Sequence, residues 1–183
     1  MPGSLAELLH DWHDFYVLVG TASATLVGLM FVAASIGASV FDESHRAALA
    51  AFITPTVVHF ASVLFACFMV VIPSHSWHSL GALLGAGGLA GAIYCGNILT
   101  QVIIRHSFNV DLIDRMFYAL IPLIGYLLAL TASVMLFMRD TMGAELIAAA
   151  LVVLLFAGVR NAWDMMVWIV LKTPNSAPPP PSS

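Results

Sequence analysis

Long apolar runs alternate along the chain with short polar segments. Five of these runs are each long enough to cross the hydrocarbon core of a bilayer, which takes about 20 apolar residues in a helix. They extend over about residues 15–40, 47–72, 79–104, 116–138 and 144–171. Because a bilayer offers no water to backbone polar groups, we expect runs of this length to be helical. A membrane strand barrel needs alternating segments of about 10 residues, and the sequence lacks them.

The sequence before the first run predicts a short amphipathic helix. Ser4 and Glu7 have the spacing of a capping box, which satisfies free backbone N–H groups at a helix start. Apolar residues recur at helical spacing from Leu5 to Trp12, so we expect this helix to lie on the outer membrane surface. The proline-rich tail, residues 173–183, is expected to be disordered or extended. Residues 1–172 then form a single five-helix transmembrane domain.

Composition agrees with a membrane protein and limits its partners. Hydrophobic residues make up 61% of the chain and charged residues 9%, whereas soluble domains carry about 25% charged residues. The formal net charge is −4 and no basic cluster occurs, so nucleic acid is not an expected partner. The sequence therefore predicts an all-α polytopic membrane protein whose main partner is the lipid bilayer.

Basic residues are unevenly divided between the two predicted membrane faces. One face receives Arg46, Arg105, Arg115 and Lys172, whereas the other receives only Arg139. Because positively charged short loops stay in the cytoplasm, we expect the N-terminus outside and the C-terminus in the cytoplasm. The short loops and the many alanines and glycines are compatible with a bacterial inner (plasma) membrane.

Small residues recur at helical spacing in the first and third runs, which lets neighbouring membrane helices approach closely. The set consists of Gly20, Ala24, Gly28, Gly81, Gly85, Gly87 and Gly91. The same pattern serves packing within one bundle and contact between subunits of a homo-oligomer or a membrane complex. The sequence leaves both uses open.

Polar residues inside the predicted spans are the main candidate site, because an ionisable group in a membrane is costly and marks function. This intramembrane polar layer consists of His59, Arg160, Asp164, Asn161, Asn97, Tyr126 and Thr54. Arg160 and Asp164 are four residues apart, so they can neutralise each other on one face of a helix. Arg160, His59 and Tyr126 are expected at the same depth, near the bilayer centre. Asp164, Asn97 and Thr54 are expected about 8 to 9 Å closer to the cytoplasm.

Two interpretations of the layer are open. In the first, His59 and Asp164 exchange a proton or a small ion, as in a small channel or transporter. In the second, the polar groups only tie helices together, and the protein is a non-catalytic accessory or assembly subunit of a membrane complex. Pro55 permits a helix kink beside the layer and slightly favours the first interpretation. We therefore predict a channel-like or transporter-like bundle.

Four histidines on the expected outer face are candidate metal ligands. His10 and His13 are three residues apart, as are His75 and His78, so each pair can present two imidazoles to copper or zinc. Alternatively, these residues only sit at the headgroup level of the membrane. The sequence has no Walker-type phosphate loop, zinc-protease motif or nucleophile elbow, so enzyme activity is not expected.

Overall fold

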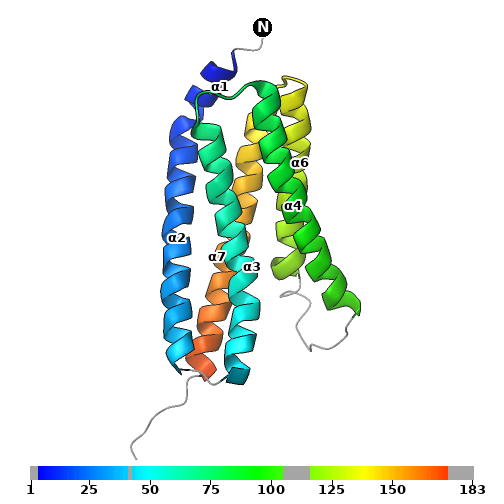
Figure 1. Cartoon of the computed structure of the whole chain (residues 1–183). Coiled ribbons are helices and arrows are strands. Elements are labelled where there is room, and N and C mark those ends of the chain that lie inside the picture. Colours follow the sequence, from blue (N-terminus) through cyan, green and yellow to red (C-terminus); the bar gives the residue numbers. More distant parts are fainter. Residues whose placement is uncertain (1–3, 41–42, 105–115, 173–183) are drawn as a thin grey trace, which may run out of the picture.

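The computed structural model describes residues 4–40, 43–104 and 116–172 of the chain. These residues are helical apart from short turns. The elements are α1 (Leu5–Asp11), α2 (His13–Val40), α3 (Glu43–Val71), α4 (Trp77–Ile104), the π-helical turn η1 (Met116–Leu120), α6 (Ile121–Phe137) and α7 (Met142–Lys172). Figure 1 shows the long helices running up and down in one bundle.

Five helical stretches are long and apolar enough to cross a membrane. They are His13–Gly37, Ile53–Val71, Trp77–Thr100, Tyr118–Phe137 and Met142–Val167. The described residues are therefore all-helical, with five helices long and apolar enough to span a membrane, which confirms this part of the prediction. The predicted disordered tail, residues 173–183, lies outside the described residues.

Helix α1 begins with the capping box that the sequence contains. The Ser4 hydroxyl oxygen accepts a hydrogen bond from the backbone N–H of Glu7 at 3.3 Å. The Glu7 carboxylate in turn accepts one from the backbone N–H of Ser4 at 2.9 Å. Two of the N–H groups that a helix start leaves free are thereby satisfied. The side chain of Leu5 is buried in the main core, and the location of α1 on a membrane surface stays a prediction.

The helices pack as two groups that share α7. Helices α2, α3 and α7 pack together, while α4 packs along α6, and α6 along α7. By comparison, α3 and α4 make few contacts with each other, and Figure 1 shows them diverging towards the end at which α4 ends. Among the long helices that follow one another along the chain, α3 and α4 are therefore the least closely packed pair.

Glycines of α4 allow α6 to approach its backbone. A Cβ added to Gly88 would lie 3.3 Å from the backbone nitrogen of Leu130, and one added to Gly85 would meet the Ser133 hydroxyl. The Ser133 hydroxyl donates a hydrogen bond to the carbonyl oxygen of Gly81 at 2.6 Å. Gly81, Gly85 and Gly88 therefore serve packing between α4 and α6 within this chain.

The small residues of the first run divide between two environments. Gly20 packs against α3, where an added Cβ would lie 3.1 Å from Cβ of Cys67. Ala24 and Gly28 are exposed instead, and a Cβ on Gly28 would meet nothing within 4 Å. Within the chain, the close approach of α2 to α3 therefore uses Gly20 and leaves Ala24 and Gly28 on the outer face.

Candidate functional site

His59 of α3 and Tyr126 of α6 meet in the interior of the bundle. The side chain of His59 is 0% exposed and that of Tyr126 is 2% exposed. Nδ1 of His59 lies 3.0 Å from the Tyr126 hydroxyl oxygen, and the two ring centroids are 5.7 Å apart. The sequence places both residues at one depth, and the structure brings them into contact.

Ser62 extends this contact into a chain of hydrogen bonds. The Tyr126 hydroxyl donates to Oγ of Ser62 at 3.0 Å, and the Ser62 hydroxyl donates to the carbonyl oxygen of Val58 at 2.8 Å. Ser62 follows His59 by three residues, so both lie on one face of α3. Sequence reasoning missed Ser62. Ser62 lies three residues after His59, and Tyr126 is expected at the depth of His59. These two facts together would have predicted Ser62 as a member of the site.

These hydrogen bonds assign the proton of the His59 ring. Tyr126 has a single hydroxyl proton, which it gives to Ser62, so Nδ1 of His59 donates to the Tyr126 oxygen. In a neutral imidazole, Nε2 is then an acceptor. Nε2 is buried and has no hydrogen-bond partner among the residues that the structure describes. A buried polar atom without a partner costs about 1–3 kcal/mol, and Nε2 is the open end of this chain of hydrogen bonds.

Arg160 and Asp164 form an ion pair within α7, as their spacing predicts. Their side chains are 37% and 40% exposed, so the pair is partly exposed, whereas His59 is fully buried. The two charges neutralise each other, which lowers the cost of holding them within a membrane-spanning helix.

The other members of the expected polar layer do not form one cluster either. Asn161 is 5% exposed, and its Nδ2 atom has no hydrogen-bond partner in the described part of the chain. Asn97 and Thr54 lie on exposed faces of α4 and α3. The structure thus brings His59 and Tyr126 together and keeps Asn161 buried on α7. Asn97 and Thr54 lie on exposed faces, and Arg160 and Asp164 are partly exposed.

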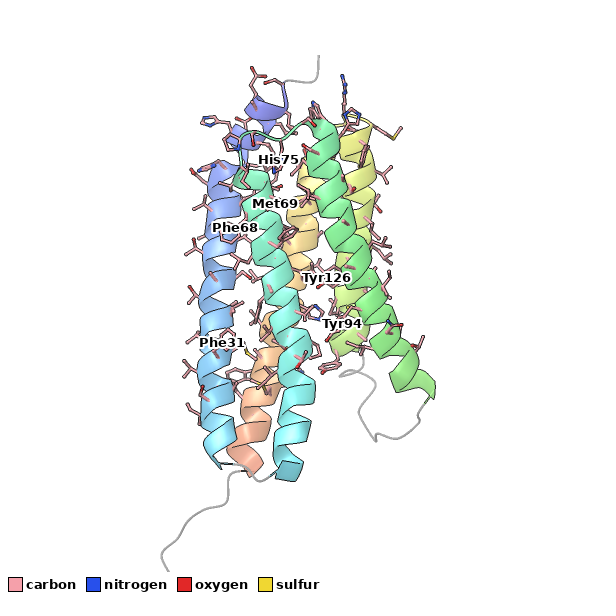
Figure 2. All side chains as sticks on the ribbon, viewed as in Figure 1. Phe31, Phe68, Met69, His75, Tyr94 and Tyr126 are labelled. Atoms are coloured by element: carbon pink, nitrogen blue, oxygen red, sulfur yellow. The ribbon has the colours of Figure 1, made fainter. Side chains whose placement is uncertain are left out.

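A cavity of about 410 Å³ lies between α3 and α4, beside the hydrogen-bond chain. Its volume falls in the range of small-molecule sites, about 300–1,000 Å³. Ser62 and Tyr126 contribute to its lining, together with Tyr94 of α4, and the rest of the lining is apolar. Figure 2 shows Tyr94 and Tyr126 in the space between α3 and α4.

The four candidate metal ligands lie at the end of the bundle where the chain begins. His10 and His13 are exposed, and the ring of His78 packs on Phe137 with centroids 5.7 Å apart. Figure 2 places His75 at the same end, where α4 begins. No three His, Cys, Asp or Glu side chains of the described ranges are grouped to hold a metal ion. A copper or zinc site at this face stays a prediction.

The fold and the site define a polytopic helical bundle, suited to a membrane, with a polar chain buried at its centre. Comparisons with protein-family models, with curated proteins and with solved structures give no match to this chain. Its function therefore has to follow from the geometry of the site.

Proposed function

We propose that this protein passes a proton across the membrane, as a small channel or transporter, and that His59 takes and releases that proton. The supporting observation is the buried chain from Nε2 of His59 through Tyr126 to Ser62. Imidazole gains and loses protons at physiological pH. An ionisable group buried within a membrane-spanning helix is characteristic of proton relays and ion pathways.

The direction of the hydrogen bonds gives the order of proton steps. A proton that reaches Nε2 of His59 lets Nδ1 pass its own proton to Tyr126. The Tyr126 hydroxyl proton then moves to Ser62. As Ser62 receives this proton, it gives its own hydroxyl proton to a water molecule, once that hydroxyl has turned from the Val58 carbonyl. Rotation of the three polar groups returns the chain to its starting arrangement.

Proton flux into proteoliposomes tests this proposal. We expect a pH gradient to drive flux through the wild-type protein and not through His59→Gln. His78→Gln is the matched control, because His78 lies exposed at the end of the bundle. Each variant must remain monodisperse in detergent. Equal flux in wild type and His59→Gln contradicts the proposal, as does the absence of flux in the wild type.

The outer face of α2 favours a second function, that of an assembly subunit. Thr21, Ala24, Thr25 and Gly28 are all exposed on this helix. Small residues of this kind let a helix of another chain approach closely. Under this alternative the hydrogen bonds of His59 only tie α3 to α6, and the wild-type protein carries no proton flux. The alternative also predicts a co-purifying partner that Gly28→Leu no longer binds, or a homo-oligomer that Gly28→Leu dissociates.

The proposed setting is a bacterial inner membrane with the N-terminus outside. Arg46 near the start of α3 and Lys172 at the end of α7 lie at one end of the bundle, whereas Glu7 and Asp11 lie at the other (Figure 1). The positive-inside rule assigns the basic end to the cytoplasm. Labelling of single cysteines at each end with a membrane-impermeant maleimide tests this orientation in intact cells.

A further inference from the structure

We infer that the cavity between α3 and α4 binds a lipid-soluble small molecule with a carbonyl oxygen on a ring-sized apolar body. The inference goes beyond proton passage and does not depend on it, because it rests on the shape, the lining and the opening of the cavity. Three observations carry it.

The lining selects an apolar body. Phe65 of α3, Leu84 of α4 and Ile147 of α7 are among the side chains that surround the space. Water finds few hydrogen-bond partners in such a cavity, whereas an apolar molecule keeps close contact with its walls. The volume of about 410 Å³ accommodates a substituted ring.

The position of the cavity opening favours a ligand that enters from the bilayer. Ala61 and Phe65 of α3 and Ala90 of α4 line the cavity and are exposed, whereas Ala129 and Leu154 on the inner side are buried. All of these residues lie within the membrane-spanning stretches. The opening therefore faces hydrocarbon, which a neutral lipid-soluble molecule enters readily and an ion does not.

The polar groups of the lining select a hydrogen-bond acceptor. Tyr94 lines the cavity, and its hydroxyl has no hydrogen-bond partner in the residues described by the structure. A phenol hydroxyl in apolar surroundings gains free energy by donating to an oxygen. A carbonyl oxygen accepts this bond, and a second one from Ser62 once that hydroxyl turns from Val58.

Duroquinone, a fully methylated benzoquinone, is the probe for the test. Durene has the same methylated ring without the carbonyl oxygens and serves as the matched probe. Binding is measured by equilibrium dialysis of the full-length protein in phosphatidylcholine nanodiscs, with empty nanodiscs to subtract partition into lipid. We expect saturable binding of duroquinone above that background, and weaker binding of durene.

Filling the cavity should remove this binding. A Cβ on Gly87 would meet only Phe65, at 3.8 Å, so the larger side chain of Gly87→Leu extends into the space without a backbone clash. Gly96→Leu is the matched control on the same helix, because a Cβ on Gly96 would meet nothing within 4 Å and Gly96 does not line the cavity. We expect at least about tenfold weaker binding in Gly87→Leu and none of that loss in Gly96→Leu. Ala90→Phe, at the exposed border, blocks entry if Gly87→Leu fails to fold.

Tyr94→Phe separates the carbonyl contact from the apolar one. We expect duroquinone to bind about tenfold more weakly to this variant, and durene to bind as it does to the wild type. Three results overturn the inference: no saturable binding to the wild type, full binding to both cavity-blocking variants, or equal weakening of both probes by Tyr94→Phe. If the wild-type protein binds duroquinone but carries no proton flux, the proposed function is wrong and the inferred binding site is still supported.

Discussion

The ring of Tyr126 occupies the space that a side chain at Gly91 of α4 would fill. A Cβ built on Gly91 would overlap ring carbons Cδ1 and Cε1 of Tyr126. The hydroxyl of the same ring is held between His59 and Ser62, so the ring cannot turn away without losing those bonds. Gly91 thus positions the buried polar chain although it has no side chain of its own.

The Gly91→Ala substitution should destabilise the protein. Forcing a methyl group against a ring that is held in place typically costs about 1–3 kcal/mol, beyond the helix propensity that alanine contributes. Denaturation in detergent micelles measures the change in the free energy of unfolding. Gly87→Ala is the control, because its Cβ would make only an ordinary contact with Phe65. If both variants lose the same stability, Gly91 has no special role.

The His59 ring should carry its proton on Nδ1. The hydrogen bond from Tyr126 to Ser62 leaves His59 as the donor of the bond to Tyr126. Nitrogen NMR of histidine-labelled protein in lipid, assigned with His59→Gln, distinguishes the protonated ring nitrogen from the bare one. A proton on Nε2 of the neutral ring would show that the hydrogen bonds run in the opposite direction.

Arg139 at the end of α6 stands in the left-handed backbone region, with φ of 60°. Its N–H donates to the carbonyl oxygen of Leu136 at 3.0 Å, and the next N–H, that of Asp140, donates to Met135 at 3.0 Å. Glycine usually occupies such a position, because residues with a Cβ are strained there.

Arg139→Gly should therefore raise the free energy of unfolding by about 1 kcal/mol. Thermal unfolding in detergent provides the measurement. Arg139→Ala loses the same charge and keeps the strained backbone, so it should not stabilise. Equal stabilisation by both substitutions would assign the effect to the charge.

The partly exposed ion pair of α7 should matter for stability and not for flux. Asp164→Asn removes the carboxylate that neutralises Arg160, so we expect a lower melting temperature in detergent. Proton flux per folded protein in proteoliposomes should stay at the wild-type level, because the pair is partly exposed whereas His59 is fully buried. Loss of flux in a folded Asp164→Asn protein would place Asp164 in the pathway, as the sequence alone suggests.

The sequence predicts the membrane-spanning helices well because an apolar run of about 20 residues has few other stable structures in lipid. Depth along each helix also follows from the sequence, since the rise per residue is fixed. For this reason Arg160, His59 and Tyr126 are expected at one level. His59 and Tyr126 are in contact, whereas Arg160 pairs with Asp164 on its own helix.

Rotation of each helix about its own axis is what the sequence does not reveal. In a membrane the lipid-facing side is as apolar as the packed side, so hydrophobic periodicity does not distinguish them. Asn97 and Thr54 therefore join the expected layer by depth, although both face outward. The same uncertainty hides Gly88, which contacts the backbone of α6, and Ser62, which completes the polar chain.

Proton flux through Tyr126→Phe and Tyr16→Phe tests the central claim most directly. The Tyr16 hydroxyl also joins two helices, because it donates to the carbonyl oxygen of Ala144 at 3.0 Å. Each substitution thus removes a buried tyrosine hydroxyl and its link between helices, at a cost of about 1 kcal/mol for each bond lost. Only Tyr126→Phe interrupts the path from His59 to Ser62. We predict that flux in proteoliposomes is lost in Tyr126→Phe and retained in Tyr16→Phe. Equal flux in the two folded variants would contradict a proton pathway through Tyr126.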